Sequence, residues 1–427
     1  MKIHIKNGHL IDPANGIDAT QDVYIVDDKI AAIGQAPADF KADKTIDASG
    51  LVVAPGFVDL SARLREPGYE YKATLESEMQ AAMQGGVTSL VCPPDTEPVL
   101  DEPGLVEMLK HRAKSLNQAH VYPLGALTVG LKGEALTEMA ELTDAGCIAF
   151  SQADCPILDT TVMLRAMQYA QTFEYSVWLR PQDPHIGRNG VAHSGPVASR
   201  LGLSGVSAMA ETLALHTIFE LVRATGARVH LCRMSTAGGL ELVRAAKKEG
   251  LPITCDVGAH HIHLTENDIG FFDSNARLTP PLRGQRDRDA IRTALLDGTI
   301  DAICSDHTPV DDDEKLLPFG EASPGATGLE LLLSLALKWA EESGDKKQQL
   351  SRAVAKITAD AARVAGLQSG QLSVGSIADI CVFDPATRWT VQASALASQG
   401  KHTPFLGYEL SGQVTTTIVA GHVAFQR

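Results

Sequence analysis

Residues 228–257, RVHLCRMSTAGGLELVRAAKKEGLPITCDV, contain two short apolar segments separated by a stretch with helical periodicity. Arg228–Arg233 and Pro252–Val257 are mostly continuous apolar runs, which is typical of strands buried on both faces of a parallel sheet. The segment between them places apolar residues on one helical face, at Leu240, Val243 and Ala246. We expect this helix to have Ser235 as its N-cap and to stop at Gly250. The stretch therefore predicts a strand, a helix and a second, parallel strand.

The same unit recurs along the middle of the chain. Eight short apolar runs have the character of buried strands: Gly56–Ala62, Thr88–Cys92, Val121–Leu124, Cys147–Ser151, Tyr175–Arg180, Arg228–Arg233, Pro252–Val257 and Asp301–Ser305. Eight strand–helix units within roughly 300 residues predict an α/β protein with a (β/α)8 TIM-type barrel, which we place at residues 53–364. In such a barrel the functional residues lie at the C-terminal ends of the strands.

Both ends of the chain are rich in predicted strands. These are Ile3–Ile5, Asp22–Val26 and Lys29–Ile33 near the start, and Ile380–Phe383, Gln413–Val419 and His422–Phe425 near the end. Neither end is long enough to bury a core alone, so we expect residues 1–52 and 365–427 to pair into one small β domain. Asp43 to Gly50 is interpreted as a linker into the barrel.

Composition restricts the class of protein. The 427 residues carry a formal net charge of −15, and an acidic surface repels phosphate backbones, so we expect no nucleic-acid partner. No run approaches the ~20 apolar residues that cross a bilayer, and the start lacks the apolar core of a signal peptide, so we expect no membrane segment and a cytoplasmic location. The seven cysteines are scattered and form no C-x-x-C pair, which fits buried thiols in a reducing compartment.

Several short motifs occur in a fixed order along the chain. They are Pro55–Leu60 (PGFVDL), Leu64–Gly68 (LREPG), Pro280–Arg283 (PPLR), Ser305–Pro309 (SDHTP), Gly328–Glu330 (GLE), Gly375–Ile380 (GSIADI) and Thr403–Phe405 (TPF). Together they resemble the dihydroorotase family of the amidohydrolase superfamily, and the resemblance covers essentially the whole chain. It implies zinc-dependent hydrolysis or formation of a cyclic amide at the barrel mouth.

The chain departs from this family at the implied metal ligands. The resemblance implies His-x-His after the first strand, a bridging carboxylate after the fourth, and single histidines after the fifth and sixth. The corresponding residues here are Ser61 and Arg63, then Gln152 or Ala153, then Arg180 and Arg233. Of the implied site, only the aspartate after the eighth strand is retained, as Asp306.

These replacements argue against a zinc ion. A catalytic zinc needs about three protein ligands drawn from His, Cys, Asp and Glu. Arginine stays protonated and repels a dication. We therefore predict no zinc and no other cofactor, and we expect the three arginines to neutralise Asp306 in an ion-pair cluster. In this interpretation Asp306 is vestigial and no longer a catalytic base.

The implied substrate-binding positions are mixed. Arg65 matches the family's arginine for the substrate carboxylate, and it is either a vestigial anion site or a structural ion-pair partner. Asp95 and Thr279 stand where the family has asparagines, and Val310 stands where it has a histidine. His261 matches a histidine that contacts substrate.

Two further clusters have alternative interpretations. His260, His261 and His263 could suggest a replacement metal site, but neighbours on a strand point to opposite faces, so a structural role is favoured. The acidic run from Asp311 to Glu314 is either a solvated loop or a lid or docking segment over the barrel mouth.

An intact scaffold around an altered site favours a catalytically inactive dihydroorotase-like subunit. The resemblance implies its partner, because such chains accompany aspartate transcarbamoylase in some bacteria, in de novo pyrimidine biosynthesis. It also implies a homodimer or higher oligomer within a hetero-oligomer. One alternative is a remodelled, metal-free cyclic-amide hydrolase, for which Ser61 is the nearest nucleophile. Another is a sensor that binds an anionic pathway intermediate among Arg63, Arg65, Arg180 and Arg233.

Overall fold

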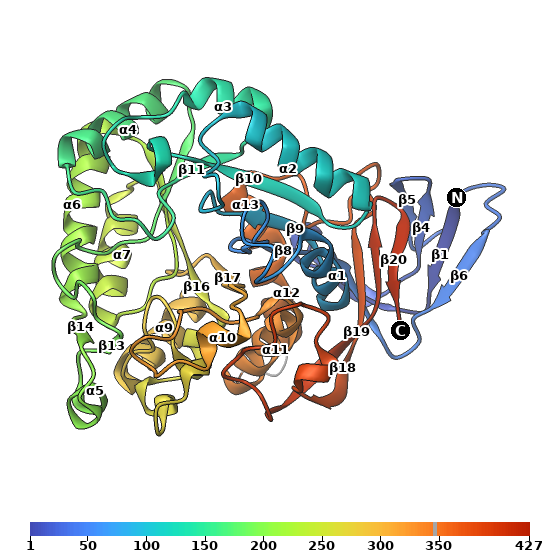
Figure 1. The fold of residues 1–427 in the computed structure, drawn as a ribbon. Coiled ribbons are helices and arrows are strands. Elements are labelled where there is room, and N and C mark those ends of the chain that lie inside the picture. The colour runs from blue at the N-terminus through green and yellow to red at the C-terminus, as the bar shows by residue number, and fades with distance from the viewer. Residues whose placement is uncertain (345–347) are drawn as a thin grey trace.

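The computed structural model describes residues 1–344 and 348–427, and its largest unit is a barrel of eight parallel strands (Figure 1). In order around the sheet they are β8 (Phe57–Asp59), β9 (Val87–Cys92), β10 (His120–Ala126), β11 (Ala149–Ser151), β12 (Ser176–Leu179), β15 (Arg228–Leu231), β16 (Ile253–Gly258) and β17 (Ala302–Cys304). Each predicted strand overlaps one of these, so the predicted barrel is confirmed. Beyond β8 and β17, a parallel bridge between Ala62 and His307 joins the first and last strands.

Helices surround this sheet on its outer side (Figure 1). The longer ones are α1 (Leu75–Gly85), α2 (Pro103–Leu116), α3 (Met139–Ala145), α4 (Thr160–Thr172), α6 (Met209–Thr225), α7 (Ala237–Glu249), α9 (Gln285–Leu296), α11 (Leu332–Glu342), α12 (Gln349–Ile357) and α13 (Ala359–Ala365). The short helices α5 (Pro196–Leu201), α8 (Ala259–His263) and α10 (Asp312–Lys315) lie in loops, as does the small strand pair β13 (Ala192–His193) and β14 (Gly205–Val206).

Helix α7 starts one residue later than the sequence suggested. Its N-cap is Thr236, whose hydroxyl accepts a hydrogen bond from the Gly239 amide at 3.0 Å. The expected cap, Ser235, instead donates its hydroxyl to the buried carboxylate of Glu211 at 2.6 Å. A tertiary partner therefore decides which of two adjacent hydroxyl residues caps the helix. The predicted stop at Gly250 is confirmed, with φ of 90° in the left-handed region.

Strands from both termini form the small β domain at one end of the molecule (Figure 1). One sheet has the order β5 (Lys29–Ile33), β4 (Val23–Val26), β1 (Lys2–Lys6), β6 (Lys44–Asp47). The other has the order β20 (His422–Gln426), β19 (Glu409–Val419), β18 (Ile380–Thr390), β7 (Val52–Pro55), β2 (His9–Asp12), β3 (Ile17–Thr20). The pairing of β7 with β18 joins the two ends of the chain, as expected. We retain 1–52 with 365–427, and 53–364, as the proposed domain division.

The interpretation of residues 43–50 as a linker was wrong in part. Residues Lys44–Asp47 form β6, which pairs in parallel with β1 and places Ile46 in the core of the small domain. The paired residues are about 40 positions apart in sequence, so no local sequence pattern predicts this pairing. The cysteines are all free thiols, and within the described residues no helix is long and apolar enough to cross a membrane.

Candidate functional site at the barrel mouth

The residues after the strands turn into the mouth of the barrel on unusual backbone conformations. Four non-glycine residues there have positive φ: Arg65 at 62°, Ala153 at 49°, Arg233 at 56° and Asp306 at 50°. Such conformations are uncommon for side-chain-bearing residues and cluster at functional sites, where the surrounding contacts maintain them. The scaffold thus retains the sharply turned strand ends of a site.

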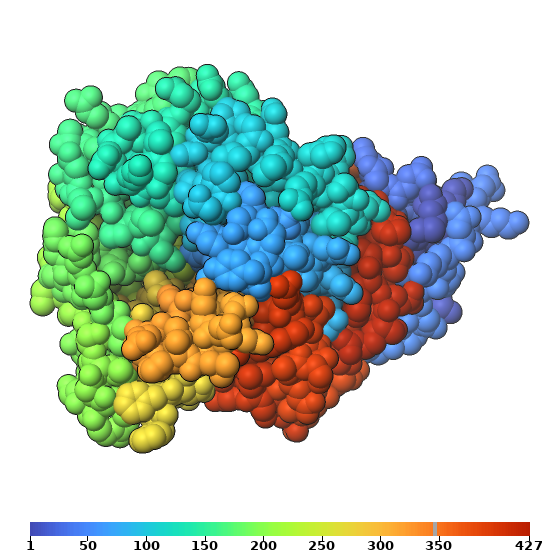
Figure 2. Space-filling model, viewed as in Figure 1, coloured from blue at the N-terminus to red at the C-terminus, as the bar shows by residue number. Residues whose placement is uncertain are grey.

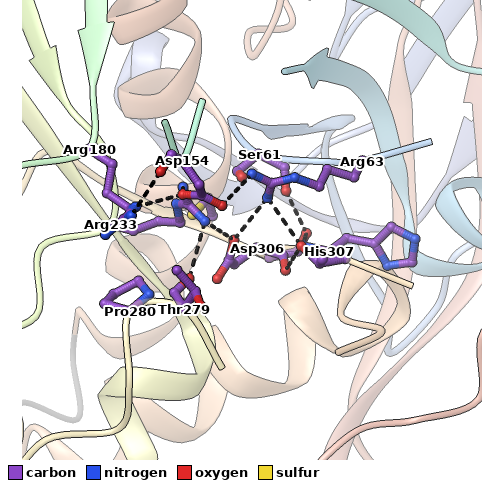
Figure 3. A network of polar contacts seen from close by, with 12 residues as sticks. Ser61, Arg63, Asp154, Arg180, Arg233, Thr279, Pro280, Asp306 and His307 are labelled. Carbon is purple, nitrogen blue, oxygen red and sulfur yellow. Dashed lines mark hydrogen bonds and ion pairs between the residues drawn. The ribbon is translucent and has the colours of Figure 1, made fainter. Parts of the chain in front are cut away.

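Asp154 is the centre of the charged cluster in this mouth (Figure 3). Its carboxylate accepts from Arg180 Nε at 2.6 Å and Arg63 Nη2 at 2.8 Å, and also from Arg233 Nη2. Burial raises the pKa of the Asp154 carboxyl, but the three guanidinium groups outweigh burial and hold the pKa well below its usual range. Asp154 is therefore ionised at every physiological pH.

Asp306 is a peripheral member of this cluster. Its Oδ1 accepts from Arg233 Nη1 at 3.1 Å and lies 3.8 Å from Arg63 Nη1. Burial raises the pKa of Asp306 above its usual range, and the arginines offset burial only in part. The arginines were expected to neutralise Asp306, whereas in the structure all three contact Asp154.

Arg63 links the cluster to the loop after the second strand. Its Nε donates to Asp95 Oδ2 at 2.7 Å, and its Nη1 donates to the Thr308 hydroxyl at 3.2 Å. Asp95 is thus one side of an ion pair. Three arginines face three aspartates, so these six side chains are balanced in charge, and their mutual pairing limits the cost of burying them.

Three of the four implied substrate-binding residues, Arg65, Asp95 and Thr279, line a cavity of about 170 Å³ beside this cluster. Arg65 donates from Nε to the Pro309 carbonyl at 2.9 Å, and its guanidinium lines the cavity. Thr279 also lines it, and its main-chain carbonyl accepts from Arg233 Nη1 at 3.2 Å. His261 lies 3.1 Å from the Pro280 carbonyl, and burial lowers the pKa of this imidazole to about 4. The structure thus places Arg65 and Thr279 on the cavity.

Ser61, Gln152 and Ala153 lie outside the charged cluster. The Ser61 carbonyl accepts from the His307 amide at 3.0 Å, where the barrel closes. The Gln152 side chain donates to the Thr128 hydroxyl and to the Leu131 carbonyl, both at 2.9 Å. Ala153 has a positive φ, and this backbone turn directly precedes Asp154. The acidic residue of this loop is one position beyond those that the family pattern indicated.

The three clustered histidines were expected on a strand, but they are not part of one. They occupy one turn of helix, α8, and their contacts diverge. His260 stacks on the Phe405 ring with centroids 5.7 Å apart, while His263 Nε2 lies 2.9 Å from the Leu335 carbonyl. Burial lowers the pKa of His260 to about 3 and that of His263 to about 4, so both are neutral. Each contributes to packing of the loop.

The side chains of the mouth do not fit a zinc ion. Its carboxylates, Asp95, Asp154 and Asp306, each bind a guanidinium group, and a protonated arginine cannot coordinate a metal. Over residues 1–344 and 348–427, no group of three or more His, Cys, Asp or Glu side chains is arranged to hold a metal.

The acidic run after the eighth strand is anchored at two points. Glu314 pairs with Lys72 Nζ at 2.8 Å, and Asp312 Oδ1 lies 2.8 Å from His402 Nε2. Residues Asp312–Lys315 form α10, which Asp311 caps by accepting from the Asp313 amide. The run is thus a short helix anchored by contacts with Lys72 and His402.

Sequence reasoning missed the role of Asp154. An available signal was charge balance, since three buried arginines need more than one carboxylate and Asp154 is the acid that follows the fourth strand. The family pattern drew attention to residues 152 and 153 instead. Only the direction of the strand-end turn shows which side chain enters the mouth.

The fold is that of two hydantoinases of known structure. An L-hydantoinase from Arthrobacter aurescens superimposes with a TM-score of 0.87 at 23% identity, over 99% of this chain and 96% of that one. A D-hydantoinase from Thermus sp. superimposes with a TM-score of 0.84, also at 23% identity, over 99% and 95%. At this identity the likeness concerns the fold.

Sequence comparison identifies the family. The Dihydro-orotase-like family matches residues 50–238, and the Amidohydrolase family matches residues 205–424. A dihydroorotase-like protein from Pseudomonas aeruginosa is 43% identical over 426 residues, and a dihydroorotase from Citrifermentans bemidjiense is 39% identical over 426 residues, each covering 100% of both chains. This chain therefore belongs to the dihydroorotase-like proteins of the amidohydrolase superfamily, as its motifs indicated.

Proposed function

We propose that this chain is a catalytically inactive, zinc-free dihydroorotase-like subunit that acts as a structural partner of aspartate transcarbamoylase. The observation that carries the proposal is the pairing of Asp154 with Arg63, Arg180 and Arg233. These arginines stand where the family resemblance implies metal ligands. A cation that entered the mouth would have to separate three ion pairs and then lie beside guanidinium groups that keep their charge.

The catalytic steps of the family have no substitute among the neighbouring side chains. Asp306 would be the proton shuttle, but it is held by Arg233. Ser61 would need a base, and the histidines of this mouth bond elsewhere: His307 to Glu78 at 2.6 Å and His261 to the Pro280 carbonyl. General acid–base help alone contributes only ~10²–10⁴-fold. The metal-free hydrolase is accordingly the weaker alternative.

The family resemblance implies the partner, aspartate transcarbamoylase. A regular barrel retained around an altered site fits a chain whose surface, and not its pocket, is under selection. In this proposal the chain works in the cytoplasm, in de novo pyrimidine biosynthesis, as a dimer or higher oligomer within a hetero-oligomer with the transcarbamoylase catalytic chain.

Three measurements on one preparation test the proposal. Elemental analysis of chain purified without added metal should give less than about 0.1 equivalent of zinc, since a site of this family needs several ligands. Dihydroorotase turnover should be absent with and without added zinc. Sedimentation with purified transcarbamoylase catalytic chain should give a stoichiometric complex. Zinc at one equivalent with turnover, or separate sedimentation of the two chains, would contradict it.

Arg65 supports a second, compatible function as an anion sensor. Its guanidinium adds a fourth positive charge beside the three balanced pairs and borders the cavity of about 170 Å³. Isothermal titration with carbamoyl-aspartate should give saturable binding that is lost in Arg65→Ala and unaffected in a surface variant such as Arg388→Ala. If the titration of the unmodified chain shows no binding heat, the sensor function is refuted and the structural-partner function is unaffected.

A further inference from the structure

Four large apolar side chains are exposed beside the barrel mouth. They come from two loops, and we call them the mouth patch: Phe271 and Phe272, which are 91% and 39% exposed, and Leu316 and Leu317, which are 80% and 43% exposed. The space-filling view shows the yellow segment around residue 270 next to the orange segment around residue 315 on one face (Figure 2). Exposed apolar side chains gathered on neighbouring loops are typical of sites that bind another molecule.

A buried lysine fixes the two loops to each other. Lys315, which is 2% exposed, donates from Nζ to the Ser274 carbonyl at 2.9 Å and to the Arg277 carbonyl at 3.3 Å. The Ser274 hydroxyl donates in return to the Lys315 carbonyl at 2.6 Å. Since Leu316 and Leu317 follow Lys315 directly, and Phe271 and Phe272 closely precede Ser274, the patch is held in place by hydrogen bonds. It is thus prepared for binding before a partner arrives.

The turn that carries the two phenylalanines is strained. Phe272 has φ of +65°, a conformation that bulky side chains rarely adopt, and Gly270 before it has φ of +55°. The two rings lie edge to face with centroids 5.5 Å apart. Strained backbone that displays apolar side chains to water does not help the chain to fold, whereas it is a common feature of binding sites.

The exposed charged side chains of the two segments that carry the patch are all acidic. In residues 267–273 and 311–321, which are all described, the exposed charged side chains are Asp268, Asp273, Asp312, Asp313 and Glu321. Lys315 is the only lysine or arginine in these segments, and it is buried. An apolar centre with a charged rim is the usual anatomy of a protein interface.

We propose that the mouth patch is the surface through which this chain docks a protein partner whose contact face has an apolar hollow edged by lysine and arginine. The inference rests on the proposed function, in which that partner is the transcarbamoylase catalytic chain. Charge selects this occupant. A second copy related by a twofold axis would bring two acidic rims together, and an anionic lipid surface would be repelled in the same way.

The experiment measures binding of the purified transcarbamoylase catalytic chain to three forms of the full chain. Phe271→Ser with Leu316→Ser removes the two most exposed patch residues. Leu158→Ser with Val374→Ser is the matched control, because these side chains are 66% and 65% exposed elsewhere. Loss of central apolar contacts should weaken binding ~30-fold or more, while the control should stay within ~2-fold of the unmodified chain. Circular dichroism should show that all three forms are folded.

A second variant tests the acidic rim. Asp313→Lys with Glu321→Lys should slow association ~10-fold or more at low salt and flatten its dependence on ionic strength. The assignment of this surface would be overturned if the patch variant bound as tightly as the unmodified chain, or if charge reversal left the association rate unchanged. Either result would leave the proposed function intact. Failure of the unmodified chain to bind would overturn both.

Discussion

Replacing Asp154 with asparagine tests whether one carboxylate holds the barrel mouth together. The change keeps the size of the side chain and removes the charge shared by Arg63, Arg180 and Arg233. The arginine side chains are 5–6% exposed, so the variant leaves them buried with one carboxylate fewer, whereas Asp154 itself is 32% exposed. Removal of one partner from a buried ion pair costs ~3–5 kcal/mol, and the partial exposure of Asp154 favours the lower end.

The expected loss is therefore about 3 kcal/mol in the free energy of unfolding. For 427 residues at ~2.1 cal/mol/K per residue, the entropy of unfolding is about 0.9 kcal/mol/K, which gives a fall in Tm of roughly 3 °C. Urea unfolding followed by circular dichroism, with calorimetry, measures both quantities. Asp144→Asn, an exposed site on α3, is the control and should change stability by less than ~0.5 kcal/mol.

The pH dependence has a defined sign. The pKa of Asp154 is depressed below its unfolded value of about 3.9, so its stabilisation is complete above that pH and is lost as the pH falls below it. The difference between Asp154→Asn and the unmodified chain should be constant from about pH 5 to 8 and shrink below about pH 4. An unchanged free energy of unfolding at pH 7, or a difference that grows on acidification, would refute the central role of Asp154.

Three further outcomes are expected. Dialysis against EDTA should leave the Tm within about 1 °C, because a ligand that does not bind the native state cannot stabilise it; a larger fall would reveal a structural metal. Glu78→Gln should lower the free energy of unfolding by ~3–5 kcal/mol in urea titrations, since it breaks a pair with His307 in which both side chains are fully buried. Burial lowers the pKa of Lys315 to about 7 in the native state. Between about pH 7 and 10 the unfolded chain therefore binds a proton that the native chain does not, and the free energy of unfolding should rise with pH over this range. Lys315→Met should abolish that rise relative to the unmodified chain, and should speed hydrogen exchange at residues 311–325 as its bonds to the Ser274 and Arg277 carbonyls disappear.

The arrangement of charges explains how a family site can change without loss of the fold. Here Arg63, Arg180 and Arg233 are paired with Asp95, Asp154 and Asp306. The strand-end turns at Ala153 and Asp306 have left-handed backbone conformations. Because these six side chains balance one another in charge, their burial is compatible with an intact barrel.

The sequence by itself determined the architecture and the family. Hydrophobic runs of four to seven residues, separated by helical periodicity, located all eight barrel strands, because burial of both sheet faces imposes apolar residues locally. The short motifs from PGFVDL to TPF identified the family, and the same register predicted that Arg63, Arg180 and Arg233 stand at positions where the resemblance implies ligands. These properties depend on the order of residue types along the chain.

Only the tertiary structure decided which groups meet. It turned Asp154 into the mouth in place of Gln152, paired β6 with β1 across about 40 residues, placed His260 and His263 on one helical turn, and joined the loop at Phe271 to the loop at Leu316. Each outcome depends on the direction in which a side chain leaves the backbone and on a partner far away in sequence. Local propensity contains neither, because the energy of an ion pair or a buried hydrogen bond depends on distances that exist only after the chain has folded.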